Sequence, residues 1–185
     1  TAEFTEVEYL YVDNNVKDHD NITSIIYKEN EGSFLAGALA AMMTTETEVP
    51  NITAEKTIGM VGGMDIPVIR NFQVGYQEGA KYIDSETEVE TVFAGDFEDP
   101  AQGKESALTL FSQGADVVFA AAGKTGEGVF QAAAENKKYV IGVDADQRYI
   151  NPDVIIASVV KAVNVSVYES IERIINDELN SGSLY

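Results

Sequence analysis

Residues Lys138–Gln147, KYVIGVDADQ, contain the stretch that decides the fold. Tyr139–Val143 is short, apolar and partly β-branched, and charged residues bound it on both sides. A run of this kind predicts a strand that is buried on both faces, as in a parallel sheet. The run ends in Asp144 and, two residues later, Asp146. In open α/β folds ligands bind outside the carboxyl ends of the strands, so we expect these carboxylates to lie beside a ligand site.

Similar apolar runs alternate with amphipathic stretches on both sides of this strand. The predicted strands are 57–63, 89–95, 116–123, 139–144 and 154–160, and the predicted helices are 67–83, 99–113, 125–136 and 162–179. Prolines in the first turns of two of these helices support the assignment, because the missing N–H has no partner there anyway. The alternation, with its short loops, predicts an α/β fold with a doubly wound parallel sheet.

The N-terminal segment is predicted to hold two short strands, 7–12 and 24–28, and a helix from an N-cap at Ser33 to about residue 45. Three elements in 45 residues are marginal as an independent domain. They either dock on the rest of the chain or belong to a lobe whose remainder lies elsewhere. Residues 46–56 are polar and include Pro50, which is typical of a linker.

Composition excludes several classes of protein. The formal net charge of the 185 residues is -19, so nucleic acid is not an expected partner. The chain has no cysteine, which excludes disulfides and thiolate zinc sites. His19 is the single histidine, which excludes a His-rich metal site. No apolar run reaches the roughly 18 residues of a membrane span.

The ends of the predicted strands supply the candidate site residues. They are Met64, Phe119, Gly123, Asp144 and Lys161, and the carboxyl ends of parallel strands converge on one edge of a sheet. Together they describe a small-molecule site with an apolar wall and a polar end. Two alternatives stay open at this point: Phe119 also has the apolar neighbours of a core residue, and Lys161 also suits a solvated position.

Several motifs that suggest other chemistry fail on spacing. Gly123–Thr125 resembles the end of a phosphate loop. That motif requires a second glycine five residues earlier, where this chain has Val118. Asp144 and Asp146 form a D-x-D pair without a partner acidic cluster. We therefore predict no catalytic residues, no metal and no cofactor.

Several long blocks of the sequence carry a family likeness. The blocks are EGSFLAGALAAMM (31–43), IGMVGGMDIPVIRNFQVGYQEGAKYI (58–83), AGDFEDPAQGKESAL (94–108), GADVVFAAAGKTGEGVFQAA (114–133), VIGVDADQ (140–147) and SVVK (158–161). With these blocks in this order, the chain resembles the basic membrane protein family, the purine nucleoside-binding lipoproteins of ABC transporters, from about residue 6 to 179.

This resemblance implies the type I periplasmic-binding-protein fold, in which two α/β lobes hold the ligand in a cleft. Residues 1–45 would be a remnant of the N-terminal lobe, 46–56 a linker or hinge, and 57–185 the C-terminal lobe. The remnant is expected to pack on a second copy of the chain, to exchange with it, or to be mobile. The lipidated signal, much of the N-terminal lobe and a closing segment are expected to lie outside this fragment.

The family also implies residue roles. Asp144 and Lys161 would contact the ribose, Phe119 would stack on the base, and Gly123 and Met64 would lie close by. The implied function is an extracytoplasmic, lipid-anchored receptor that delivers a purine nucleoside to a membrane permease. The alternatives are a ligand-sensing regulator of the same fold and, less favoured, a metal-dependent enzyme that uses Asp144 and Asp146.

Overall fold

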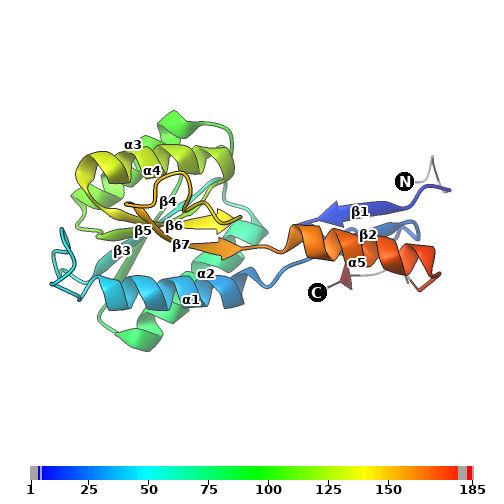
Figure 1. Cartoon of the computed structure of the whole chain (residues 1–185), viewed down its shortest axis with the longest axis horizontal. Helices are drawn as coiled ribbons and strands as arrows, with labels where there is room; N and C mark the ends of the chain where they lie inside the picture. The colour runs from blue at the N-terminus through cyan, green and yellow to red at the C-terminus, as the bar shows by residue number, and fades with distance from the viewer. Residues whose placement is uncertain (1–3, 5, 179–182, 185) are drawn as a thin grey trace. The chain divides into compact units, whose positions relative to one another are not determined.

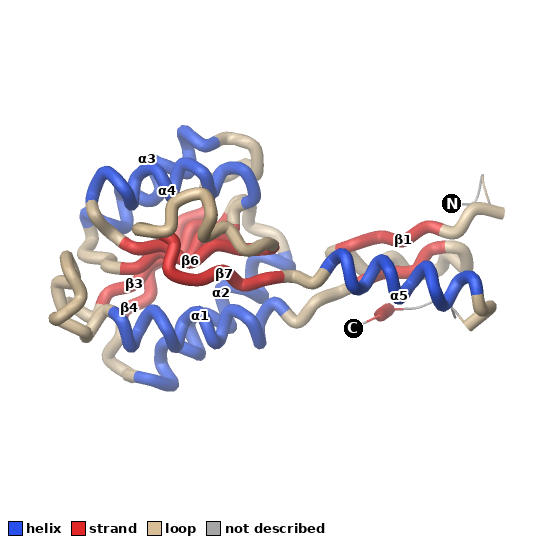
Figure 2. Tube along the Cα trace, in the orientation of Figure 1, coloured by secondary structure: helices blue, strands red, loops and turns tan. Residues whose placement is uncertain are grey.

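The computed structural model describes residues 4, 6–178 and 183–184. These residues form two compact units, a smaller one from segments 1–28 and 161–185 and a larger one from 29–160. Each unit is an α/β structure (Figures 1 and 2). No helix in the described part of the chain is long and apolar enough to cross a membrane.

The larger unit is built on a parallel sheet of five strands, as the sequence predicts. The strands are β3 (Thr57–Gly62), β4 (Glu88–Phe93), β5 (Val117–Ala121), β6 (Tyr139–Asp144) and β7 (Ile155–Val160), in the order β4-β3-β5-β6-β7. The order reverses between β3 and β5, because the chain leaves these two strands toward opposite ends of the sheet. Such a switch point is where doubly wound folds bind ligands.

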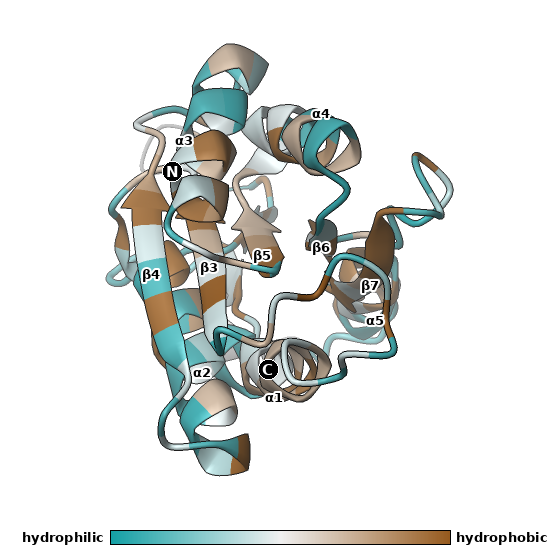
Figure 3. Ribbon diagram, turned by 90° about the vertical axis from the view of Figure 1, so that its left-hand side faces the viewer, coloured by the Kyte–Doolittle hydropathy of each residue, from teal (hydrophilic) through white to brown (hydrophobic). Residues whose placement is uncertain are grey.

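Helices cover both faces of this sheet, α1 and α2 on one and α3 and α4 on the other (Figure 3). Their bounds are α1 (Glu29–Met43), α2 (Pro67–Ile83), α3 (Pro100–Ser112) and α4 (Gly126–Asn136), with a 3₁₀ turn η1 (Gly123–Thr125) before the last. Asp99 is the N-cap of α3, at the start of the helix predicted from the sequence. Its side chain accepts hydrogen bonds from the backbone N–H groups of Ala101 and Gln102.

Strand β6 contributes side chains to the hydrophobic core on both faces of the sheet. Val140 packs with the α3–α4 side, and Ile141 and Val143 pack with the α1–α2 side. This alternation follows from the two-residue period of a strand. A strand with both faces covered must be apolar at every position, which is why this stretch could be assigned from its composition.

Helix α1 begins at Glu29, four residues before the predicted N-cap. Ser33 is buried inside the helix, and the early start places the carboxylates of Glu29 and Glu31 in the first turn, where the helix dipole favours them. Gly32 and Ser33 indicated a boundary in the sequence because both are poor helix formers. Tertiary packing outweighs that preference here.

Glycines hold α1 directly against α2. A Cβ at Gly37 would lie 1.9 Å from the carbonyl oxygen of Tyr76, and a Cβ at Gly79 would lie 1.9 Å from that of Phe34. Backbones can approach this closely only where no side chain intervenes. Helix α1 is therefore part of the larger unit.

Residues 46–56 are tied to the larger unit, although the sequence predicted a linker or hinge. Asp116, buried at the start of β5, accepts hydrogen bonds from the Thr44 hydroxyl (2.7 Å) and from the Thr53 N–H (3.1 Å). It also pairs with the Lys138 ammonium at 2.7 Å. The Tyr139 hydroxyl donates to the Pro50 carbonyl at 2.9 Å. The polar composition of residues 46–56 predicted a linker. In the structure, backbone and side-chain groups of this segment form hydrogen bonds with residues of the larger unit.

The compact units thus differ from the expected division into 1–45 and 57–185. The smaller unit contains a parallel sheet in the order β1-β2-β8, formed by β1 (Tyr9–Val12), β2 (Ile22–Ile25) and β8 (Ser183–Leu184). Helix α5 (Val163–Ile175) also belongs to it, and the last residue predicted for this helix, Leu179, lies outside the described residues. The assignment of segments to the lobes of a larger protein stays a prediction.

Candidate ligand-binding site

Three of the predicted residues lie at the carboxyl edge of the larger unit's sheet. Met64 follows β3, Gly123 follows β5, and Asp144 ends β6; these strands are neighbours in the sheet. Met64 is 42% exposed, and Gly123 and Asp144 are exposed. A thioether, an exposed glycine and a carboxylate therefore lie along the same edge of the sheet.

Asp144 sits in an uncommon backbone conformation. Its φ is 67°, and the Ala145 N–H donates to the Val143 carbonyl at 2.8 Å across it. A hydrogen bond from the N–H of residue i+2 to the carbonyl of residue i, with a positive φ at the residue between them, is the pattern of a strained γ-turn. Residues held in such conformations concentrate at functional sites, where the surrounding structure must maintain them. Aspartate is among the few side chains that tolerate this region.

The surrounding structure fixes this turn through the loop after β6. Residues 145–154 return directly to the parallel strand β7 without a helix. Gln147 folds back over β6: its Oε1 accepts from the Val143 N–H at 2.8 Å, and its N–H donates to the Ser158 hydroxyl at 3.1 Å. A Cβ at Gly142 would lie 2.4 Å from the Gln147 Oε1, so glycine inside β6 makes room for the loop.

The switch point is covered by an aromatic residue that the sequence pattern did not single out. Phe97, partly buried in the loop after β4, lies against Gly63; a Cβ at Gly63 would be 2.3 Å from the Phe97 ring. The Phe97 carbonyl accepts from the Thr125 N–H at 3.0 Å. The available signal was an aromatic residue flanked by acids in the short loop between a strand and a helix cap. Loops beside strand ends are where binding residues concentrate.

The residue after Met64, Asp65, is part of an ion pair. Arg70 donates from Nε and Nη2 to the two carboxylate oxygens of Asp65, both at 2.6 Å, and its guanidinium lies 4.6 Å from the centre of the Phe93 ring. These hydrogen bonds from Arg70 lower the pKa of the Asp65 carboxyl. Asp65 is an ion-pair partner of Arg70, and the N-cap position of α2 is Ile66.

Phe119 lies in the core and not on the open edge. Its side chain is 0% exposed, and its ring centre is 5.6 Å from that of Phe72 and 5.4 Å from that of Tyr76, both on α2. It is the third of five residues in β5, so the pleat points it into the α1–α2 layer. This geometry favours the core alternative over stacking on a base.

Lys161 belongs to the smaller unit, where its ammonium pairs with Asp13 at 2.7 Å and lies 5.5 Å from the centre of the Tyr27 ring. Its side chain is 6% exposed, whereas that of Asp13 is 39% exposed. Lys161 is thus a buried cation with a carboxylate partner, and its expected contact with a ribose stays a prediction. Asp13 has a φ of 63°, again at the carboxyl end of a strand.

Because Lys161 is more buried than Asp13, removing Asp13 should cost more free energy of unfolding than removing Lys161. Asp13→Ala should lower the free energy of unfolding by about 1–2 kcal/mol, because it removes the Asp13 carboxylate that pairs with a buried ammonium. Lys161→Met should cost less, since water reaches the carboxylate that remains. Urea unfolding, with hydrogen exchange of the β1 and β2 amides, measures both effects. Asp20→Ala is the control, as Asp20 is an exposed aspartate of the same unit. Equal costs for the two substitutions would contradict the assignment.

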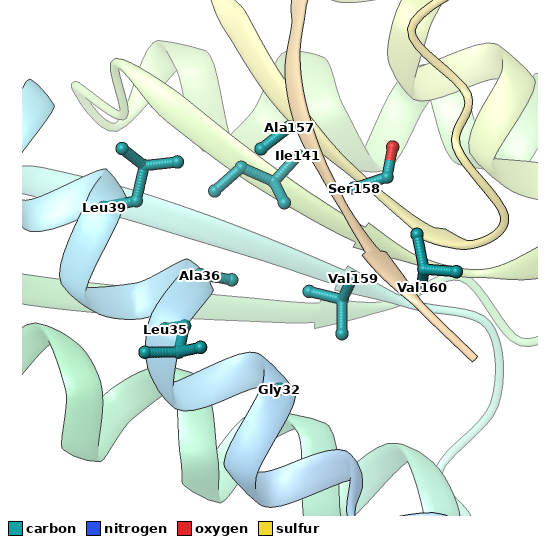
Figure 4. A pocket seen from close by; sticks show the side chains of 9 residues that line it. All are labelled: Gly32, Leu35, Ala36, Leu39, Ile141, Ala157, Ser158, Val159 and Val160. Carbon is teal, nitrogen blue, oxygen red and sulfur yellow. The ribbon is translucent and has the colours of Figure 1, made fainter. Parts of the chain in front are cut away.

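A separate pocket of about 260 Å³ lies between α1 and the edge strand β7 (Figure 4). Its walls include Leu35 and Leu39 from α1 and Val159 and Val160 from β7, and Ser158 supplies the one side-chain hydroxyl. Such a lining offers little to a hydroxyl-rich ligand. The candidate site is therefore the carboxyl edge with Asp144, Gly123, Met64 and Phe97.

Comparison with known proteins assigns the family. The family model described as "ABC transporter substrate-binding protein PnrA-like" (Bmp) matches residues 1–185. The chain belongs to this family. The family consists of substrate-binding proteins of ABC transporters, and its α/β fold is the one predicted from the sequence. The predicted resemblance to the basic membrane proteins is confirmed.

Two curated relatives and a crystal structure give the extent of the similarity. The chain is 39% identical over 150 residues to the "ABC transporter nucleoside-binding protein BmpA" of Lactococcus lactis subsp. cremoris, covering 77% of this chain and 40% of that protein. It is 34% identical over 174 residues to the "CD4+ T-cell-stimulating antigen" of Listeria monocytogenes, covering 90% and 46%.

The crystal structure is that of an ABC transporter solute-binding protein from Aeropyrum pernix K1. It matches with a TM-score of 0.90 and 31% identity, over 99% of this chain and 52% of that one. The chain therefore spans about half the length of these relatives.

Proposed function

We propose that the carboxyl edge of the larger unit contributes to a purine nucleoside site in an extracytoplasmic receptor of an ABC transporter. The observation that carries the proposal is the exposed Asp144 carboxylate, held in a strained turn by the return loop. The name of the lactococcal relative, a nucleoside-binding protein, supports the choice of ligand. The receptor would pass its ligand to a membrane permease without making or breaking a covalent bond.

The chemistry of the edge suits this ligand. A carboxylate accepts but does not donate hydrogen bonds, so Asp144 matches the two donors of a ribose 2′,3′-diol. Hydrogen bonds to a charged group contribute about 1.5–3 kcal/mol each. Phe97 offers a flat apolar surface for the base, and stacking of a base on an aromatic ring contributes about 1–3 kcal/mol. Met64 adds a polarisable contact beside it.

The test is calorimetric titration of the intact protein with inosine and 2′-deoxyinosine. Asp144→Asn keeps the size of the side chain and tolerates the positive φ, but it replaces one acceptor oxygen by a donor. We expect it to weaken inosine binding by about 10- to 100-fold and to remove most of the preference for inosine over its deoxy analogue.

Asp146→Asn is the matched control. Asp146 is an exposed carboxylate two residues away, and its Oδ1 accepts from the Arg148 N–H at 3.1 Å, a bond that asparagine can keep. We expect near-normal inosine affinity for this variant. Unchanged binding by Asp144→Asn would remove Asp144 from the site. Stabilisation of the wild-type protein by magnesium, with no response to inosine or guanosine, would overturn the proposal in favour of metal-dependent chemistry.

A further inference from the structure

One buried threonine makes several hydrogen bonds to the loop that carries Phe97, and the Gly95 N–H of the same loop donates to the Gly63 carbonyl at 2.7 Å. The Thr125 hydroxyl donates to the Asp96 carbonyl at 2.8 Å and accepts from the Asp99 N–H at 3.0 Å. The Thr125 N–H donates to the Phe97 carbonyl at 3.0 Å. Thr125 is 0% exposed, so no water competes for these bonds. Its three bonds hold the residue before Phe97, Phe97 itself and the second residue after it.

Thr125 is itself held by close packing. A Cβ at Gly103 of α3 would lie 2.0 Å from the Thr125 carbonyl oxygen, so the two backbones are in direct contact. Gly123, two residues earlier, has a φ of 56°, and a Cβ there would come within 3.2 Å of the Phe97 carbonyl oxygen. The hydrogen bonds of Thr125 therefore connect the Phe97 loop to the start of α4, and the contact of Thr125 with Gly103 connects it to α3.

One edge of the Phe97 ring lies against Gly63. Because the ring occupies the space that a side chain at Gly63 would need, a small shift of the loop would change the ring's contact with the carboxyl end of β3. Phe97 is partly buried and also packs against the core on the α1–α2 side. Thr125 bonds the loop that carries this ring.

We infer that Thr125 is the positioning residue for the aromatic wall of the ligand site: its hydroxyl sets where the Phe97 ring lies and thereby the affinity for the base of the ligand. This inference rests on the proposed function. It also assigns a role to the Gly123–Thr125 sequence, whose resemblance to a phosphate loop fails on spacing. The threonine hydroxyl of a phosphate loop binds a metal ion, whereas this hydroxyl points inward and is already bonded.

The variants that test the inference are Thr125→Val, Thr125→Ser and Phe97→Leu. Valine has the shape of threonine but neither donates nor accepts, whereas serine keeps the hydroxyl and loses only a methyl group. We expect Thr125→Val to weaken inosine binding about tenfold, because part of the stacking contribution is lost, and Thr125→Ser to bind nearly as the wild type does.

A double variant separates positioning from general weakening. If Thr125 acts through Phe97, Thr125→Val/Phe97→Leu should bind inosine no more weakly than Phe97→Leu alone. Additive losses, or wild-type binding by Thr125→Val, would overturn the inference. NMR contacts between the Phe97 ring and the Gly63 α-protons provide a readout without ligand, and they should weaken in Thr125→Val but not in Thr125→Ser. Failure of the wild-type protein to bind any nucleoside would instead overturn the proposed function, and the NMR contacts would still decide whether Thr125 positions the ring.

Discussion

Replacing Asp116 by alanine should lower the free energy of unfolding of the larger unit by about 3–5 kcal/mol, the usual cost of removing one partner of a buried ion pair. Asp116 is 0% exposed, and the Lys138 side chain that pairs with it is 14% exposed. The substitution leaves a largely buried ammonium without its carboxylate. It also removes the acceptor for the Thr44 hydroxyl and for the Thr53 N–H and hydroxyl. Urea denaturation monitored by circular dichroism measures the loss.

Graded variants distinguish the charge from the hydrogen bonds. Asp116→Asn keeps a carbonyl acceptor and should cost less than Asp116→Ala. Lys138→Met leaves the Asp116 carboxylate, which is 0% exposed, without its counter-charge, so it should also be clearly destabilising, although the Thr44 and Thr53 donors continue to bond the carboxylate. Hydrogen exchange of the Thr53 amide should accelerate in Asp116→Ala. Asp153→Ala, which removes an exposed aspartate of the same unit, serves as the control. If residues 46–56 were a free linker, Asp116→Ala would leave the Thr53 exchange rate unchanged.

Local patterns were sufficient to predict the sheet of the larger unit. The strand β6 and the helix α2 have the predicted bounds, 139–144 and 67–83, because burial on both faces and a proline in the first turn are encoded by adjacent residues. The start of α1 could not be predicted in the same way. It depends on Gly75, more than forty residues away in the chain, whose missing side chain leaves room for the backbone of Asn30 and the hydroxyl of Ser33.

The residues of the candidate site also fall into those that local sequence could predict and those that depend on distant parts of the chain. Asp144, Gly123 and Met64 could be assigned to one edge, because parallel strands bring their carboxyl ends together. Phe119 has the aromatic chemistry that a base requires, but it precedes the end of β5 by two residues and its ring lies within the sheet–helix core. Phe97, in the loop after β4, is partly buried and lies against Gly63 beyond the end of β3. Its placement depends on Gly63 and Thr125, which only the folded chain brings together.

Substituting alanine at Gly37 should destabilise the larger unit by about 1–2 kcal/mol, measured by urea denaturation. The new Cβ would meet the carbonyl oxygen of Tyr76 at 1.9 Å and the amide nitrogen of Ala80 at 3.0 Å. Both are backbone atoms, so α1 and α2 must separate, and overpacking of this kind costs about 1–3 kcal/mol or more. The higher helix propensity of alanine offsets about 1 kcal/mol of that cost. Gly79→Ala should behave alike, because its Cβ would meet the Phe34 carbonyl oxygen at the same distance.

Gly126→Ala is the matched control for this contact. It lies at the start of α4, its φ is -59°, and the nearest atom to an added Cβ is 3.7 Å away, an ordinary contact. Alanine should therefore be neutral there or stabilising by about 0.4–1 kcal/mol. The double variant Gly37→Ala/Gly79→Ala gives the sharper result. Once one methyl group has separated the helices, the second needs little further movement, so the combined loss should be smaller than the sum of the two single losses. Strictly additive losses would mean that each glycine acts through its own backbone conformation and not through the shared contact of α1 with α2.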